Sequence, residues 1–321
     1  TGSGKTHTMI GSEGEMRGII PRAVEQVAHR KAMMEESGWT FEMRVSFIEI
    51  YCEQIKDLLA SDTETEPTTK KHKIVRNEFG QSIVTDVEII PVDPADRDAI
   101  KELMEHAASL RSTSATQMNA VSSRSHSIFT LHLTAHDPSK DITLHGQLNL
   151  VDLAGSERVH KSGVSGQALT EAKHINTSLS ALAGVFIALG KKTSHVPFRD
   201  SKLTELLHPA MTANGKTLMV LNLSPIESSL KESLSSLRFG TSVNACELGK
   251  AVRVIKQGAG TKLLPALPNA SKPRSTSLSP ARTRALSPVR NPSTTRNRMQ
   301  LNGKLRSLSP VKGPKSGVRN E

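Results

Sequence analysis

The sequence predicts an α/β fold for residues 1–257 of this 321-residue chain. Three observations support the prediction. Strand-like and helix-like segments alternate along this part, several strands are short apolar runs, and the helices carry apolar stripes spaced by three and four residues. Short apolar runs are typical of central strands that are covered on both faces. We therefore expect a sheet packed between helices.

Four strands are expected. Residues 41–51 are rich in β-branched and aromatic side chains. Residues 127–135 alternate between apolar and polar side chains, as a strand does when its two faces differ. Residues 147–153 and 218–223 are short apolar runs, which we interpret as buried central strands.

Three helices are expected. Asp93 would cap the first, with Pro94 at its first position. The second is predicted over residues 170–189, where apolar side chains recur with helical spacing, and the third over residues 227–244. The apolar stripe of the first helix would consist of Ile100, Leu103, Met104 and Ala107.

The charge of the chain is unevenly distributed. The formal net charge is +11, but residues 250–321 hold 16 of the 42 Lys and Arg and only one of the 31 Asp and Glu. The residues before them are therefore slightly acidic, which argues against a folded domain that binds nucleic acid. Residues 258–321 are rich in Ser, Pro, Arg and Thr, and we expect them to form a disordered tail.

Two cysteines, no Cys-x-x-Cys spacing and no apolar signal segment are present. These features predict a reduced intracellular compartment, cytosolic or nuclear. No run of 18 apolar residues occurs, so no membrane-spanning helix is expected.

The first six residues, TGSGKT, match the second half of the Gly-x-x-x-x-Gly-Lys-Thr phosphate loop. The glycines would let backbone N–H groups surround phosphates. We expect Lys5 to reach the β- and γ-phosphate oxygens and the Thr6 hydroxyl to bind Mg²⁺. The alternative is a flexible Gly/Ser-rich segment.

A second phosphate-binding element is expected at Asp152, which follows an apolar run. Its carboxylate would stand at the carboxyl end of a buried strand, where phosphate-loop NTPases hold the Mg²⁺. Gly155 would offer a backbone N–H that no side chain shields. An ordinary strand-to-loop Asp is the alternative.

A third element is formed by Ser122 and Ser123, whose adjacent hydroxyls suit γ-phosphate, Mg²⁺ or a positioned water. Arg124 and Glu157 carry opposite charges in the two candidate sensor loops, so a salt bridge between them could close the site. Taken singly, each of these residues could also be part of a solvated loop.

The segments SGKTHTM, NAVSSRSHSIF, LVDLAGSE and HVPFRDSKLTELL resemble the kinesin motor domain in content, order and spacing, over nearly all of residues 1–250. The resemblance implies a P-loop NTPase fold, a three-layer sandwich with a mixed, mostly parallel central sheet. It also implies a microtubule-based motor, that is, a microtubule-stimulated ATPase that uses ATP and Mg²⁺. The alternative is a non-catalytic microtubule-binding protein that relies on its basic tail.

The resemblance assigns roles to the motif residues. The nucleotide would be held by Gly2, Ser3, Gly4, Lys5, Thr6 and His7, with His7 stacked against adenine. The catalytic switches would consist of Ser122, Ser123, Arg124, Gly155 and Glu157. Mg²⁺ would be held by Thr6, Ser123 and, through water, Asp152. Hydrolysis then depends on positioning and charge rather than on a covalent intermediate.

The resemblance also implies a microtubule-binding face around the helix at residues 175–189. Its basic residues would be Arg158, Lys161, Lys191, Lys192, His195, Arg199 and Lys202. Tubulin is strongly acidic, so such a patch would steer and dock the motor. Glu205 stands where some relatives carry a basic residue, which hints at a weaker grip. A solvated polar loop is the alternative.

Residues 243–251, VNACELGKA, resemble the end of the motor in the minus-end-directed, C-terminal-motor kinesin-14 subfamily. In kinesins a central strand enters the phosphate loop, so that strand, two earlier strands and a dimerising coiled coil would precede Thr1. Without that strand, the strands at residues 147–153 and 218–223 would have unpaired edges and the chain would be unstable. The expected location is the cytoplasm, on the microtubule cytoskeleton, including the spindle.

The tail repeats the unit Ser-Pro-x-Arg/Lys at Ser279, Ser287 and Ser309, which resembles the targets of proline-directed kinases. We hypothesise a second, electrostatic microtubule contact that phosphorylation weakens, because each phosphate adds about −1.5 to −2 charges. An unmodified solubilising tail is the alternative.

Overall fold

The computed structural model describes residues 2–12, 14–60, 71–113, 124–156, 167–212, 215–248, 252–257 and 260–265. The chain divides into two units, Thr1–Pro268 and Asn269–Glu321, and all described residues belong to the first.

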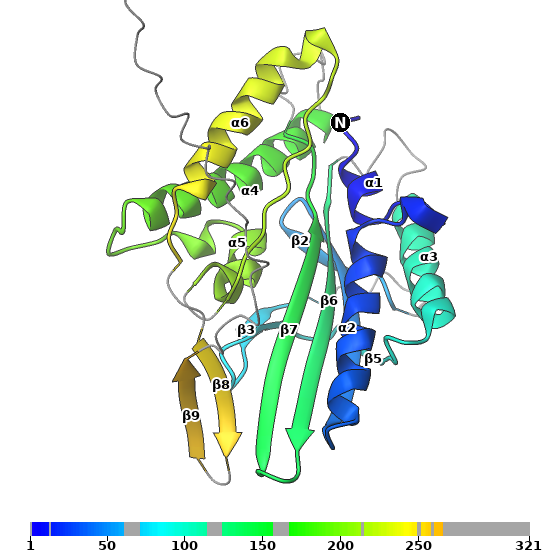
Figure 1. Ribbon diagram of the computed structural model, residues 1–321. Helices are drawn as coiled ribbons and strands as arrows, with labels where there is room; N and C mark the ends of the chain where they lie inside the picture. The colour runs from blue at the N-terminus through cyan, green and yellow to red at the C-terminus, as the bar shows by residue number, and fades with distance from the viewer. Residues whose placement is uncertain are drawn as a thin grey trace, which may run out of the picture. The chain divides into compact units, whose positions relative to one another are not determined.

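Both helices and strands occur in this unit, as expected for an α/β fold, but they come in groups rather than in the alternation that the sequence predicts (Figure 1). The strands are β1 Thr40–Tyr51, β2 Gln54–Asp57, β3 Ile74–Arg76, β4 Ser82–Val84, β5 Ile90–Pro91, β6 His126–Asp137, β7 Ile142–Asp152, β8 Val252–Gln257 and β9 Gly260–Pro265. The helices are α1 Lys5–Met9, α2 Ile19–Glu35, α3 Arg97–Thr113, α4 Gln167–Gly190, α5 Lys202–Leu207 and α6 Leu230–Asn244. Short 3-10 turns are η1 Gly14–Met16, η4 Phe198–Asp200, η5 His208–Met211 and η6 Glu227–Ser229.

The main sheet has the strand order β2-β1-β6-β7-β8-β9, with β5 added beside β1, while β3 and β4 form a separate pair. Every strand pair among the described residues is antiparallel, so the expectation of a mostly parallel sheet is wrong for this part of the chain. β1–β2, β6–β7 and β8–β9 are hairpins, and a tight connection can join only antiparallel neighbours. Apolar runs report burial on both faces, which does not fix strand direction.

Three of the four predicted strands are confirmed, in β1, β6 and β7. The fourth prediction, at residues 218–223, is wrong: this segment is extended but belongs to no strand, and Leu218 is 86% exposed. A strand needs a neighbour to bond its N–H and C=O groups. On the edge of β7 that faces away from β6, the only strand among the described residues is β8, which pairs with Ile142–Leu144. Residues 218–223 therefore have no described strand as a neighbour.

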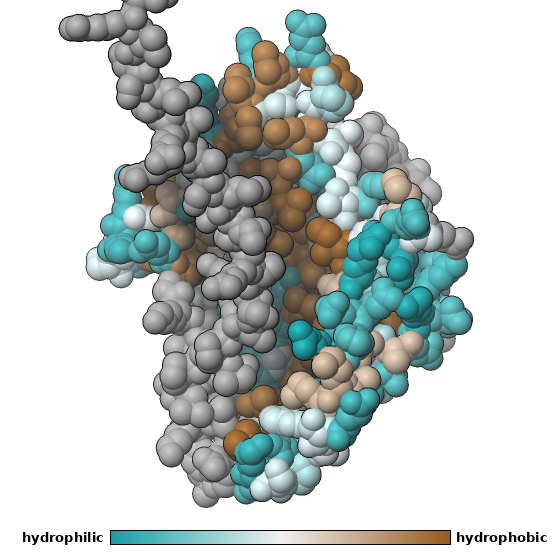
Figure 2. All heavy atoms as spheres, viewed as in Figure 1, coloured by the Kyte–Doolittle hydropathy of each residue, from teal (hydrophilic) through white to brown (hydrophobic). Residues whose placement is uncertain are grey.

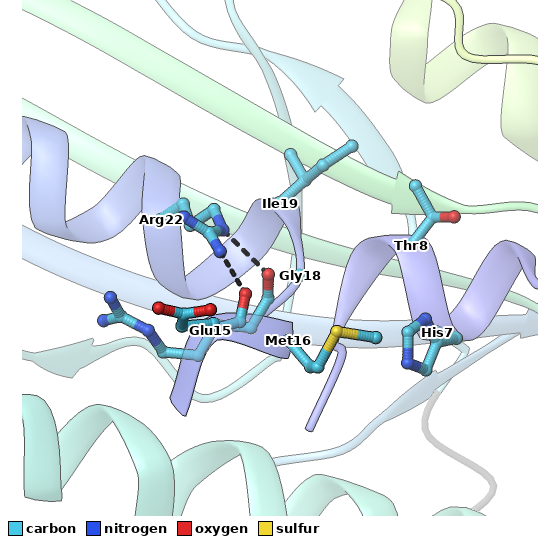
Figure 3. A pocket seen from close by; sticks show the side chains of 8 residues that line it. His7, Thr8, Glu15, Met16, Gly18, Ile19 and Arg22 are labelled. Carbon is cyan, nitrogen blue, oxygen red and sulfur yellow. Dashed lines mark hydrogen bonds between the residues drawn. The ribbon is translucent and has the colours of Figure 1, made fainter. Parts of the chain in front are cut away.

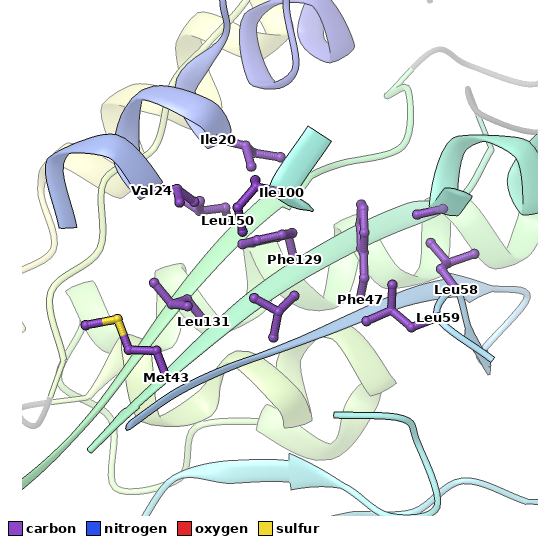
Figure 4. Close-up of a cluster of buried hydrophobic side chains, with 12 residues drawn as sticks. Ile20, Val24, Met43, Phe47, Leu58, Leu59, Ile100, Phe129, Leu131 and Leu150 are labelled. Carbon is purple, nitrogen blue, oxygen red and sulfur yellow. The ribbon is translucent and has the colours of Figure 1, made fainter. Parts of the chain in front are cut away.

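Two apolar cores cover the two faces of the sheet, which gives three layers. The first core joins α2 and α3 to the sheet (Figure 4) through Ile20, Val24, Met43, Val45, Phe47, Leu58, Leu59, Ile100, Ala107, Phe129, Leu131 and Leu150. The second joins α4, α5 and the turns around them to the other face through Ile48, Ile50, Ile128, Leu182, Val185, Phe186, Phe198, Leu203, Leu206 and Met211. Burial of one such side chain contributes about 1.5–3 kcal/mol, so both layers hold the sheet.

The start of α3 differs from its prediction. The helix begins at Arg97, and its cap is Asp96, whose Oδ1 accepts a 3.0 Å hydrogen bond from the Ala99 N–H. Asp93 instead accepts the N–H of Ala95 at 3.0 Å and forms a turn around Pro94. Both aspartates have capping chemistry, and the preceding turn decides which one the helix uses.

The hairpin of β8 and β9 extends the sheet past the expected domain end. β9, at Gly260–Pro265, lies in the segment for which the sequence predicts no fold, so that expectation is wrong for these six residues. In the hairpin register Leu263 stands opposite Val254 of β8. The rest of the predicted tail, from residue 266 on, lies outside the described residues. No described helix is long and apolar enough to cross a bilayer.

Candidate functional site

The candidate site begins where α1 meets the end of β7. Gly4 stands before α1 with φ +85°, a left-handed conformation that a residue with a Cβ adopts only at a cost. The turn aims Thr6 at the sheet, and its hydroxyl donates a 2.7 Å hydrogen bond to Asp152 Oδ2. Two residues from different motifs, 146 positions apart, are thus brought together.

Asp152 is 3% exposed, and its second oxygen, Oδ1, has no hydrogen-bond partner within the described part of the chain. A buried carboxylate oxygen without a partner is costly unless a cation or water completes its shell. A carboxylate and a hydroxyl are hard oxygen donors of the kind that Mg²⁺ prefers. The described residues contain no cluster of three or more His, Cys, Asp or Glu side chains that could hold a metal by themselves. An ion here would therefore take its remaining ligands from phosphate and water, which fits Mg²⁺ with a nucleotide.

The loop after β7 is anchored by a histidine that sequence reasoning gave no role. The Ala154 N–H donates to His126 Nδ1 at 3.1 Å, and His126 Nε2 lies 2.8 Å from the Ser178 hydroxyl on α4. Gly155, the next residue of the loop, is buried. Burial lowers the pKa of His126 to about 4, so the imidazole is neutral at pH 7. The signal available in the sequence was its place inside the segment NAVSSRSHSIF, two residues after Arg124.

A second cluster of polar side chains that the sequence did not predict lies among residues that flank the segment with Ser122 and Ser123. Ser125, directly before β6, donates a 2.5 Å hydrogen bond to Glu49 Oε1 on β1. Arg111, near the end of α3, lies 3.4 Å from the same carboxylate oxygen. All three side chains of the cluster are buried. Arg111 precedes and Ser125 follows residues 114–123, which lie outside the described residues.

His7 faces an open pocket of about 280 Å³ beside α1 (Figure 3). The pocket is lined by His7, Thr8, Glu15, Met16, Arg17, Gly18, Ile19 and Arg22. Arg22 closes one side, where its Nε donates to the Arg17 carbonyl at 2.8 Å and its Nη2 to the Glu15 carbonyl at 2.5 Å. An exposed imidazole at the rim of a pocket is free to stack on a planar ring.

The extended segment at residues 218–223 touches α1 through one polar contact. Asn222 Nδ2 donates to Thr8 Oγ1 at 2.8 Å. The segment thus runs past the same end of the molecule as Asp152 and Thr6, although it belongs to no strand. Sequence reasoning gave Asn222 no role, because an Asn inside an apolar run carries no motif.

Arg124 is half-buried at the start of the turn before β6. Several other predicted residues lie outside the described part of the chain: Ser122, Ser123, Glu157, Arg158, Lys161, Ser279, Ser287 and Ser309. The Arg124–Glu157 ion pair and the serine roles therefore stay predictions.

The basic residues predicted after α4 lie at the surface. Lys191, Lys192, His195 and Arg199 are exposed. Lys202 is half-buried and pairs with Glu205 on its own helix, with 2.9 Å between Nζ and Oε2. Lys192 lies 3.6 Å from Glu247, and an ion pair so exposed contributes little to stability. The pair with Glu205 offsets part of the positive charge that Lys202 could offer a partner.

Comparison with known proteins gives one family. The description "Kinesin motor domain" matches residues 1–246. The kinesin-like protein KIN-14M of Arabidopsis thaliana is 46% identical over 260 residues, which cover 79% of this chain and 35% of the relative. The chain thus spans about a third of the length of the curated relatives it matches.

Solved structures agree with this assignment. The motor domain of the Saccharomyces cerevisiae protein Kar3 superposes with a TM-score of 0.65 at 40% identity, covering 76% of this chain and 71% of that one. A KIF14 dimer in its two-heads-bound state, with AMP-PNP and in complex with a microtubule, superposes with a TM-score of 0.68 at 34% identity. The coverage in that case is 78% of this chain and 71% of the other.

Proposed function

Because this chain belongs to the kinesin motor family, with strong similarity to the kinesin-14 branch, we propose that it is the motor part of a microtubule-stimulated ATPase. ATP hydrolysis would drive movement along microtubules or their remodelling. The observation that carries the proposal is the contact between Thr6 and Asp152, which joins the phosphate loop to the end of β7 and leaves Asp152 Oδ1 buried and unsatisfied.

Each described site residue has a part in this proposal. The backbone of Gly2, Ser3 and Gly4 would surround the phosphates with Lys5, and His7 would stack on adenine at the rim of its pocket. Thr6 and Asp152 would hold Mg²⁺, Asp152 through water, and the ion would neutralise charge on the β- and γ-phosphates. Gly155 is buried in the loop beyond Asp152, where its N–H could meet the γ-phosphate.

The proposed track contact rests on charge. Lys191, Lys192, His195 and Arg199 are exposed near the end of α4, while the acidic partner, tubulin, would supply the opposite sign. The KIF14 relative is bound to a microtubule, which supports this use of the surface. The proposed contribution of Arg158 and Lys161 to this surface rests on the sequence alone.

Three finer proposals concern the whole protein. The KIF14 relative is a dimer, and we propose dimerisation of this protein too. Phosphorylation of Ser279, Ser287 and Ser309 by proline-directed kinases would weaken a second microtubule contact of the tail. A cytoplasmic, microtubule-bound location, including the spindle, follows from the same function.

ATP turnover tests the proposal, measured with and without microtubules and with and without Mg²⁺. Thr6→Ala should abolish Mg²⁺-dependent turnover, whereas Thr241→Ala, an exposed threonine on α6, should leave it intact. Sedimentation with microtubules without any turnover would instead support a non-catalytic microtubule binder. Turnover that Thr6→Ala leaves unchanged would contradict the site.

A further inference from the structure

His126 joins three elements through the two nitrogens of one ring. It is the first residue of β6, its Nδ1 accepts the Ala154 N–H at 3.1 Å, and its Nε2 lies 2.8 Å from Ser178 Oγ. His126 is 2% exposed and Ser178 3% exposed, so water does not compete for either bond. A buried polar junction of this kind is strong only while every bond is made.

The chemistry of the ring fixes the direction of each bond. Nδ1 accepts a hydrogen bond from the Ala154 N–H, so it carries no proton of its own. A neutral imidazole then has its proton on Nε2, which donates to the Ser178 hydroxyl. The imidazole must stay neutral and in this one tautomer for both bonds to persist, and its buried environment favours the neutral form.

The three elements have different parts in the proposed ATPase. Ala154 lies between Asp152, which bonds Thr6, and Gly155 of the candidate switch loop. α4 ends at Gly190, directly before Lys191 and Lys192 of the proposed track-binding surface. A shift of the loop by a fraction of the hydrogen-bond length must therefore move the imidazole, lose a bond, or move Ser178 with it.

We propose that His126 is a positioning residue that couples the loop at Ala154 and Gly155 to α4 through Ser178. This inference rests on the proposed function and assigns a residue to the coupling between nucleotide and track. If His126 had only a packing role, its substitution would lower stability and would lower basal and microtubule-stimulated turnover equally. Coupling predicts that the response to microtubules is lost while basal turnover remains.

Two substitutions of His126 separate its bonds. His126→Asn places an amide oxygen close to the position of Nδ1, so it retains the acceptor for Ala154 and loses Ser178. His126→Gln places an amide NH₂ close to the position of Nε2, so it retains the donor to Ser178 and loses Ala154. Ser178→Ala removes the acceptor on α4 with little change in volume. Ser242→Ala is the matched control, because this exposed helical serine on α6 also makes a hydrogen bond, to the Arg238 carbonyl.

The first measurement is the ratio of microtubule-stimulated to basal ATP turnover. Ser178→Ala should lower this ratio by about fivefold or more, the size of ordinary coupling between sites, while basal turnover is retained. His126→Asn and His126→Gln should lower the ratio by a similar factor. The double variant His126→Asn/Ser178→Ala should lose no more than the single ones, because all of them break the same path. A normal ratio in Ser178→Ala, or an equal loss of basal and stimulated turnover, would overturn the proposal.

A second measurement decides the inference without turnover. Amide hydrogen exchange in residues 177–190 should respond to Mg·ADP in the wild-type chain and in Ser242→Ala, but not in Ser178→Ala. Nitrogen NMR of the His126 ring should show the neutral Nε2–H tautomer at pH 7.

If the wild type turns over ATP but hydrogen exchange in α4 does not respond to nucleotide, the inference fails while the proposed function stands. If the wild type neither binds nor hydrolyses ATP, the proposed function fails. If hydrogen exchange in α4 is then also unchanged by Mg·ADP, the inference fails as well.

Discussion

Thr6 Oγ1 lies 2.7 Å from Asp152 Oδ2, and this bond holds the phosphate loop against the end of β7. It satisfies one oxygen of a buried carboxylate and leaves the other, Oδ1, without a partner among the described residues. A site built to receive a cation is expected to carry such a deficit, because the cation supplies the missing interaction. In the proposed Mg²⁺ site, the cation would supply the interaction that Asp152 Oδ1 lacks.

Asp152→Asn should separate stability from activity. The amide oxygen can still accept from Thr6, and a buried charge without a cation is removed, so the free energy of unfolding without nucleotide should stay equal or rise. Mg²⁺-dependent ATP turnover should fall about 10- to 100-fold, as for a residue that orients a metal's ligands. Urea unfolding and steady-state turnover check both halves. A large loss of stability would show that the carboxylate has a structural role instead.

His126 predicts a loss of stability in acid. Its pKa is about 4 in the folded protein against 6.5 in the unfolded chain, so between these values the unfolded chain binds a proton that the folded protein does not. The free energy of unfolding is therefore complete above pH 6.5 and falls as the pH drops towards 4. Between pH 7 and pH 5 the fall should be about 2 kcal/mol from this residue.

Urea unfolding at these two pH values checks the loss, with His126→Asn as the comparison. Burial and the nearby Arg44 also lower the pKa of His132, so part of the acid sensitivity should remain in the variant. Identical pH dependence in both proteins would contradict the assignment to His126.

Arg111→Met should destabilise the fold by about 3–5 kcal/mol, because it leaves the Glu49 carboxylate buried without its cation. Adding Glu49→Gln should recover most of this loss, since the amide still accepts from Ser125. The control is Lys101→Met on the same helix. Its pair with Glu105 is exposed, so the change should stay within about 0.5 kcal/mol. A double-mutant cycle by urea unfolding measures the coupling.

Leu218 and Leu203 should respond oppositely to truncation. Leu203 is fully buried in α5, so Leu203→Ala should cost about 2–5 kcal/mol. Leu218 is 86% exposed, so Leu218→Ala should change stability by less than about 0.5 kcal/mol.

Leu218 also belongs to a set of exposed apolar side chains on residues 218–226 and α6, and Figure 2 shows hydrophobic residues gathered on the viewed surface in this region. The set includes Leu218, Val220, Leu221, Leu223, Ile226, Leu230, Leu234 and Leu237. Leu218→Lys should therefore reduce aggregation, as measured by light scattering, because it interrupts an exposed apolar segment. Unchanged scattering would mean that association uses another surface.

The sequence was sufficient where function depends on local order. The glycines before Lys5, the apolar run before Asp152 and the paired hydroxyls before Arg124 are recognisable because each motif is contiguous. The same holds for β1, β6, β7, α3, α4 and α6, whose periodicity is a local property, whereas α2 at Ile19–Glu35 was not predicted. Chain order is enough to identify these parts as those of a kinesin motor.

The tertiary structure decided what depends on neighbours. Residues 218–223 have the composition of a strand but form none, because a strand exists only when another strand takes up its hydrogen bonds. Strand direction followed from hairpin connections rather than from apolar content. The junction at His126 and the Glu49–Arg111–Ser125 cluster could not be foreseen, because their partners lie far apart in the chain and only burial makes their bonds strong. The sequence by itself determined which chemical groups the protein carries, and the fold decided which of them meet, because hydrogen bonds and desolvation act over a few ångströms of space rather than along the chain.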